Sequence, residues 1–289
     1  MGEPTKQGNQ RRKKPDRVKT ENKISACITA CNEEDKIGRC LRSLTWCDEI
    51  IVVDSFSKDR TIEICREFTD RVYQHEWLGY IGQKNLIRNM AVNPWVFFLD
   101  ADEEVSPKLR IAIEKIFSKN PRDYVGYQFP RMVYYLGKWI RYGEWYPDTK
   151  LRLFLKDLGK SSGREPHDHV IVDGPVRTLT APIYHYTYDS ISDHLATMNR
   201  FSSITAREKY REGIRFHWVD ILFRPWWRFC KAYFFKRGFV CGRHGILIAT
   251  ISSFAVMMKY YKLWEIEHNA AQNPNYLKEA GIEDQTGKP

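Results

Sequence analysis

The most constraining feature of the sequence is a run of large apolar residues, Trp95–Leu99, that ends abruptly at acidic residues. It follows Pro94 and contains no charge, a pattern typical of a strand covered on both faces in an α/β domain. Ligands of open α/β sheets bind just beyond the carboxyl ends of the strands, so Asp100 and Asp102 are predicted to stand at the mouth of a site. Carboxylates two residues apart can face one point and share a hard cation. Taken alone, this Asp-x-Asp pattern is weak evidence, because a solvated acidic turn also produces it.

The flanking residues alternate between short apolar runs and segments with helical spacing. Strand patterns cover 24–30, 50–53 and 71–74, and helical patterns cover 36–44, 61–68, 79–90 and 107–117. A β-α alternation at intervals of about 25 residues predicts an α/β fold with a doubly wound sheet and right-handed crossovers. Residues 124–185 are strand-like and aromatic, and a helical pattern returns from about residue 189.

Polar residues follow the predicted strands. They are Asn32 and Glu33 after the first, Asp54 after the second, Asp100 and Asp102 after the fourth, and Gln83, Lys84 and Asn85 in the intervening loop. Topology places the strand ends along one edge, where a nucleotide diphosphate could lie. Glu33 and Asp54 could read its base and ribose, and the two later aspartates could hold a metal for its phosphates. The chain has no G-x-G-x-x-G or Walker pattern, which disfavours a dinucleotide or P-loop site.

Several short motifs together carry a resemblance to a known family. They are ITACNEE at 28–34, DEIIVVDS at 48–55, QKN at 83–85 and LDADE at 99–103, followed by WYPD at 145–148, LRLF at 151–154 and PHDH at 166–169. The chain resembles the family 2 inverting glycosyltransferases of GT-A fold over roughly residues 24–265, including the stretch 238–265. The most similar subgroup is the lipopolysaccharide-core β-1,4-glucosyltransferase-like proteins of bacteria.

The resemblance implies roles for the strand-end residues. Glu33 and Asp54 would bind a nucleotide-sugar donor, with a UDP-sugar favoured. Asp100 and Asp102 would engage the ribose and a Mg²⁺ or Mn²⁺ ion, which stabilises charge on the leaving diphosphate. Lys84 would add a positive charge on the same phosphates, although an exposed lysine at a helix start is the alternative.

Inversion by direct displacement also requires a base on the acceptor side, whose removal typically costs about 10²–10⁴ in rate. Asp168 is the predicted base and His167 its catalytic neighbour; other subgroup members carry His-Glu here, so this carboxylate is one methylene shorter. His167 or His169 would complete the metal shell, or each would be a hydrogen-bonded loop histidine. Asp148 and Arg152 are further candidates, for which a salt bridge beside a strand is the preferred account.

Charge and aromatic residues divide the chain into four predicted parts. Half of the formal net charge of +10 lies in residues 1–23. Residues 1–22 are expected to be a disordered basic tail, 23–188 a GT-A catalytic domain, 189–268 a helical membrane-associating region and 269–289 a flexible tail. The seven cysteines include no Cys-x-x-Cys pair, which fits a reducing cytosol.

The helical region combines an aromatic, basic stretch at 210–239 with an uncharged run of 14 residues at 245–258. A transmembrane helix needs about 20 residues, so this run predicts a buried or interfacial helix. Aromatic rings at headgroup depth and Arg/Lys on lipid phosphates would make it an in-plane anchor. A packed helical pair or a dimer interface is the alternative.

These features together predict a cytoplasmic glycosyltransferase, peripheral on the inner face of the cell membrane, with a lipid-linked glycan acceptor such as lipopolysaccharide core. Nucleic acid is not an expected partner. Two alternatives are a nucleotidyltransferase acting on sugar phosphates, which would release pyrophosphate, and a non-catalytic basic, aromatic binding protein. The second explains the charge but not the carboxylates at several strand ends.

Overall fold

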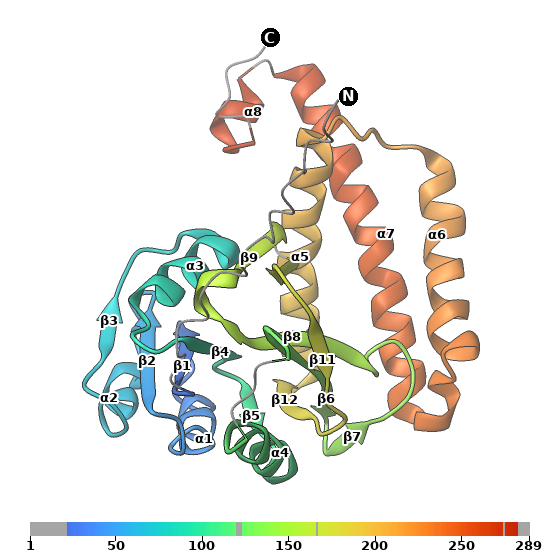
Figure 1. The fold of residues 1–289 in the computed structure, drawn as a ribbon. Coiled ribbons are helices and arrows are strands. Elements are labelled where there is room, and N and C mark those ends of the chain that lie inside the picture. The colour runs from blue at the N-terminus through green and yellow to red at the C-terminus, as the bar shows by residue number, and fades with distance from the viewer. Residues whose placement is uncertain (1–21, 120–122, 166, 274, 283–289) are drawn as a thin grey trace, which may run out of the picture.

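The computed structural model describes residues 22–119, 123–165, 167–273 and 275–282. Within these residues the chain forms a mixed ten-stranded sheet, a separate two-stranded hairpin and a group of long helices to one side (Figure 1). The sheet follows the order β3-β2-β1-β4-β8-β6-β12-β5, and β7 and β11 both pair with β6. The α/β fold predicted from the sequence is confirmed.

The first half of the sheet is parallel. It contains β1 (Ile24–Ala30), β2 (Glu49–Asp54), β3 (Val72–Gln74) and β4 (Trp95–Asp100), connected by α1 (Ile37–Arg42), α2 (Thr61–Arg66) and α3 (Gly79–Met90). The register sets Ala30 beside Asp54 and Thr29 beside Asp100. The carboxyl ends of β1, β2 and β4 therefore meet at one edge, as expected.

The second half of the sheet has a different architecture from the doubly wound parallel half. Here β8 (Asp148–Leu155) runs antiparallel to both β4 and β6 (Gly126–Tyr135), and β12 (Ile183–Tyr188) joins β6 to β5 (Glu103–Val105). The shorter elements are β7 (Lys138–Ile140), β11 (Val176–Thr178), the 3-10 turn η1 (Lys156–Leu158) and α4 (Pro107–Phe117). Residues 124–185 hold short turns in place of crossover helices, and antiparallel neighbours need only such turns.

The two faces of the parallel half are both buried. Successive residues of β4 point to opposite faces: Phe97 joins α1, α2 and α4, whereas Phe98 joins α3. The hairpin of β9 (Gly159–Arg164) and β10 (His167–Val172) packs on the α3 side, where Val170 and Val172 complete the second cluster. This placement carries β10 to the edge where the parallel strands end.

The helices after β12 stand beside the antiparallel half (Figure 1). They are α5 (Ile191–Arg211), α6 (Trp218–Cys230) and α7 (Arg243–Gln272), with the π-helical turn η2 (Lys231–Phe235) and the 3-10 turn η3 (Gly238–Cys241) between the last two. The chain ascends α5, descends α6 and ascends α7. Ile248 of α7 packs with Val133 and Tyr135 of β6, so this helix is fastened to the sheet.

The structure shows that two segments of this region are more extensively helical than their sequence pattern alone indicates. The uncharged run at 245–258 lies inside the 30-residue helix α7, because the more polar residues that follow it are also helical. By length and composition α7 could cross a membrane, and 28% of its most apolar 18 residues is buried. The first part of the predicted tail at 269–289 is helical, through the end of α7 and α8 (Tyr276–Glu279), and Ile282 is buried. The predicted basic tail and residues 283–289 lie outside the described residues.

Candidate active site

The loops that follow β1 and β2 are bound to each other at the strand-end edge. Asn32, in the left-handed region at φ 55°, accepts a hydrogen bond from the Lys58 amide at 2.8 Å, and its own amide donates one to Ser57 Oγ at 2.8 Å. Asp54 is fully buried and accepts hydrogen bonds from the amide and the hydroxyl of Ser57. In this structure Asp54 thus braces the loop that would face a nucleotide.

Glu33 lies close to the two later aspartates. Its amide donates to Thr61 Oγ1 at 2.8 Å, which holds the β1 loop against the start of α2. Burial, and after it the nearby charge of Asp102, raises the pKa of Glu33 to about 7. The carboxyl groups of Glu33, Asp100 and Asp102 therefore lie close together. A bound cation or a proton would reduce the repulsion between their charges.

Asp100, at the end of β4, is held by two buried cations. Arg152 of β8 donates to its Oδ2 at 2.5 Å, and Lys84 of α3 lies 3.2 Å from its Oδ1. Burial opposes ionisation of Asp100, but Arg152 and Lys84 outweigh it and hold the pKa of this carboxyl well below its usual range. Asp100 is thus a permanent anion across the working pH range.

The same cations extend a chain of alternating charges through the site. Lys84 Nζ lies 3.0 Å from Asp168 Oδ2, and Arg152 lies 2.8 Å from Oε1 of Glu103, which is 1% exposed. Arg131 then joins Glu103 to Asp148, whose other oxygen meets Lys150 at 3.1 Å. Each buried charge in this chain has an opposite neighbour, which offsets the cost of removing it from water.

Asp102 has a separate partner. His185 of β12 places its Nε2 3.0 Å from Asp102 Oδ2, so the imidazole orients this carboxylate. Burial works against the charge, but His185 lowers the pKa of Asp102. No local sequence signal marks His185 or Glu103 for these roles, since His185 comes from a strand 83 residues away.

The predicted base, Asp168, reaches the site on β10. Its Oδ2 also accepts from Ser161 Oγ at 3.2 Å across the hairpin. Near the hairpin tip, Glu165 accepts from the amides of Tyr80 and Ile81, each at 3.0 Å, and so caps α3, the helix that carries Lys84. Gly79 is required at this contact, because a Cβ there would lie 2.7 Å from Glu165 Oε1 and φ is +80°.

The structure thus gathers most of the predicted site residues. Glu33, Asp100 and Asp102 share one electrostatic environment, and Lys84 links Asp100 to Asp168. His167 starts β10, but its side chain lies outside what the structure describes; His169 is exposed. Among the further candidates, Asp148 and Arg152 both lie on β8 and form ion pairs, and the partner of Arg152 is Asp100 itself. Their roles in binding or catalysis stay predictions.

The carboxylates also allow a test of the predicted metal. Among the described residues, no group of three or more His, Cys, Asp or Glu side chains is arranged to hold a metal ion. Mg²⁺ bound with a nucleotide, however, takes one or two protein carboxylates and completes its shell with phosphate oxygens and water. Asp100 and Asp102 are hard oxygen ligands next to each other, so they fit a cation that arrives with a diphosphate.

A parallel half-sheet that ends in carboxylates, continued by an antiparallel half and bordered by a hairpin that brings Asp168 to the same edge, is the arrangement of the GT-A glycosyltransferases. Residues 25–175 match the sequence profile described as Glycosyl transferase family 2. The chain belongs to this family. The family and the enzyme class expected from the sequence are confirmed.

Relatives support the assignment over most of the length. An uncharacterized glycosyltransferase of Rickettsia typhi is 33% identical over 270 residues, covering 88% of this chain and 92% of its own. The lipopolysaccharide core biosynthesis glycosyltransferase LpsC of Rhizobium meliloti is 27% identical, covering 87% and 95%. Among solved structures, residues 1–349 of S. aureus TarS with UDP-GlcNAc match at a TM-score of 0.41 and 12% identity, covering 86% of this chain and 92% of that one. A likeness this distant carries no conclusion about ligands.

Proposed function

We propose that this enzyme transfers a hexosyl group from a nucleotide-sugar, a UDP-sugar, to a lipid-linked saccharide such as lipopolysaccharide core, with inversion at the anomeric carbon. The observation that carries the proposal is the contact of Lys84 with both Asp100 and Asp168. Through Lys84, Asp100 at the proposed donor-binding edge is linked to Asp168, which lies on the hairpin that borders the site. Donor chemistry and acceptor deprotonation could therefore occur side by side.

In the proposed step, an acceptor hydroxyl oxygen forms a bond to the anomeric carbon on one face of the sugar. The bond from that carbon to the donor phosphate oxygen breaks on the opposite face, and its electron pair leaves with the nucleoside diphosphate. Asp168 accepts the proton of the hydroxyl, which raises the nucleophilicity of the oxygen as the new bond forms. His167, next to Asp168, is the second proposed catalytic residue.

Other residues bind and orient the donor. Glu33 and the loop braced by Asp54 are proposed to contact base and ribose, and Lys84 the diphosphate, where a positive charge offsets the developing negative one. Asp100 and Asp102 would hold Mg²⁺ or Mn²⁺, which supplies further stabilisation of the leaving diphosphate when bound.

The acceptor and the location are inferred from the helical region and from the relatives. The outer side of α6 exposes Trp218, Leu222, Phe223 and Trp226, each by 65–68%. Exposed aromatic residues on this scale gain more at a membrane interface than in water. A relative named for lipopolysaccharide core biosynthesis supports a saccharide acceptor carried on a lipid. The enzyme is accordingly proposed to work at the cytoplasmic face of the membrane, and residues 23–188 and 189–268 to be its catalytic and membrane-associating parts.

The proposal is tested first by thermal unfolding of the purified protein with a panel of nucleoside diphosphates, each with and without Mn²⁺. A ligand at a hundred times its Kd stabilises by about 2.7 kcal/mol. Stabilisation by UDP that requires the cation is expected. If no nucleotide stabilises the folded protein, the donor site is wrong.

Activity then tests the base. Asp168→Asn should lower transfer by about 10²–10⁴-fold while UDP stabilisation persists. Asp173→Asn, on the turn after the same hairpin, is the matched control and should leave the rate unchanged. Release of a nucleoside diphosphate is expected, whereas release of pyrophosphate would favour the nucleotidyltransferase alternative. Full activity in Asp168→Asn would remove Asp168 from the mechanism.

A further inference from the structure

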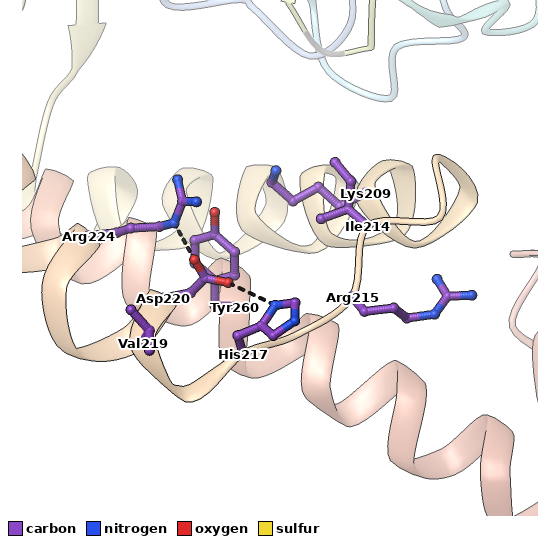
Figure 2. A pocket seen from close by; sticks show the side chains of 8 residues that line it. All are labelled: Lys209, Ile214, Arg215, His217, Val219, Asp220, Arg224 and Tyr260. Atoms are coloured by element: carbon purple, nitrogen blue, oxygen red, sulfur yellow. Dashed lines mark hydrogen bonds and ion pairs between the residues drawn. The ribbon is translucent and has the colours of Figure 1, made fainter.

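A second charged site lies outside the catalytic edge, at the elbow between α5 and α6. An open cavity of about 590 Å³ is lined by Lys209, Ile214, Arg215, His217, Val219, Asp220, Arg224 and Tyr260 (Figure 2). Three of these are Lys or Arg and one is a histidine. Among the residues that line it in the described part of the chain, Asp220 carries the sole carboxylate.

Asp220 is already engaged by its neighbours. Figure 2 shows it between Arg224 and His217, with a hydrogen bond from Arg224 Nε and a distance of 3.8 Å to His217 Nδ1. The remaining positive charges are not offset in this way. Within the described residues, neither Lys209 nor Arg215 forms an ion pair with a carboxylate.

Three cations lie close to the ring of Tyr260, one of the residues that line the cavity. Lys209 Nζ, Arg224 Cζ and Lys259 Nζ lie 5.6, 5.5 and 4.9 Å from the centroid of Tyr260. Burial, and then repulsion from Lys209, lowers the pKa of Lys259 to about 8. Like charges held this close favour the binding of an anion between them.

The cavity adjoins the apolar face of α6. Asp220 and Arg224 line the cavity, and the exposed side chains of Trp218, Leu222 and Phe223 alternate with them along the same two turns. A ligand that fits both features has an anionic head and an apolar body. A free phosphate ion would match the cationic cavity but not the apolar face of α6.

We propose that the elbow between α5 and α6 binds the phosphate headgroup of an anionic membrane lipid, whose acyl chains lie against the apolar face of α6. The proposal rests on the membrane association put forward above and adds a specific headgroup site to it. Lys209 lies eight residues beyond Phe201 on α5, about 12 Å along the helix. Phe201 contacts Tyr80 of α3, at 6.4 Å between ring centroids. A lipid in the elbow would therefore hold the catalytic edge near the membrane surface.

Vesicle binding of the full chain tests this site. Phosphatidylcholine vesicles are compared with vesicles containing about one third phosphatidylglycerol, at about 0.1 M salt. The wild type should prefer the anionic vesicles. Lys209→Gln/Arg215→Gln/Arg224→Gln should bind them about 100-fold more weakly, because each cation at the surface contributes separately.

A matched control removes the same charge elsewhere. Lys108→Gln/Lys115→Gln/Lys119→Gln on and after α4 alters three exposed lysines far from the elbow in Figure 1, and should bind as the wild type does. If both triple variants lost the same amount of affinity for the anionic vesicles, net charge alone would explain the loss and the headgroup site would be overturned. Saturation of the elbow by inorganic phosphate, without any preference for anionic vesicles, would also overturn it.

Two further readouts separate this proposal from others. UDP stabilisation, which reports the catalytic edge, is measured on the same variants and should not change. A wild type that prefers anionic vesicles but binds no nucleotide would refute the proposed function and still support the headgroup site. A dimer that buries the α6 face and shows no vesicle binding would assign this face to a second copy of the chain.

Discussion

Arg152 offers the sharpest test of how the site is held together. Arg152→Met replaces a side chain that is 7% exposed with an apolar one of similar length. It leaves Asp100 and Glu103, which lie 2.5 and 2.8 Å from the guanidinium, without their shared partner. Removal of one member of a buried ion pair costs about 3–5 kcal/mol.

The neighbouring charges place the expected cost at the lower end of that range. Asp100 keeps Lys84, and Glu103 keeps Arg131. We therefore expect Arg152→Met to lower the free energy of unfolding by about 3 kcal/mol, measured by urea denaturation at pH 7. At about 2–4 °C per kcal/mol, the midpoint of thermal unfolding should fall by about 6–12 °C.

The loss of stability in Arg152→Met should depend on pH in a characteristic way. Because the folded pKa of Asp100 is depressed, its stabilisation is present above the unfolded pKa of about 3.9 and is lost as pH falls below it. The difference in the free energy of unfolding between the wild type and Arg152→Met should thus be largest near neutral pH and should become smaller below about pH 4. Arg60→Met is the control, since Arg60 and Glu63 are both 71% exposed and their pair contributes about 0.5 kcal/mol or less. A loss in Arg152→Met no larger than in Arg60→Met would refute the reasoning.

Two further predictions concern single residues. His194 is buried and stacked on Tyr188, with 4.3 Å between the ring centroids, and burial lowers its pKa to about 4. The neutral imidazole therefore makes its full contribution to the free energy of unfolding above about pH 6.5, the unfolded pKa. This free energy should fall by about 3 kcal/mol as the pH drops to 4, because the unfolded chain takes up the proton first. His194→Gln should flatten this part of the pH–stability curve in urea titrations, and an unchanged slope would exclude His194 as its origin. Gly79→Ala should destabilise by more than Gly137→Ala, because both have φ near +80° but a Cβ at Gly79 meets Glu165 whereas one at Gly137 meets nothing within 4 Å. The shared φ costs about 1–2 kcal/mol, and equal losses in thermal unfolding would show that the Glu165 contact has no effect.

The parallel half of the fold was predictable from local pattern. The run Trp95–Leu99 is apolar at every position, as a strand buried on both faces requires, and the strand ends at Asp100, one residue beyond this run. Because parallel strands end at one edge, Glu33 and Asp102 could be expected near each other although 69 positions separate them along the chain.

The partners of these carboxylates could not be predicted in the same way. Arg152 and His185 reach the site from strands whose pairing depends on tertiary contacts, and nothing in their local sequence indicates which carboxylate each will meet. The antiparallel half and the length of α7 were missed for a related reason. Apolar periodicity identifies buried faces, but it does not set the order of strands, and a helix continues through polar residues once it is packed.

The chain passes from the sheet to the helices once, between β12 and α5, and the helices then return to the sheet through several contacts, among them Ile248 with Val133 and His194 with Tyr135. Because the chain crosses between the two parts once, the helical part forms one continuous segment. A chimera joined at Asp189, with the side chains that contact the sheet and its loops preserved, would exchange the whole helical part and is expected to leave the catalytic edge intact. One ancestral transferase could be redirected in this way to a different membrane or a different carrier lipid while its chemistry stayed the same.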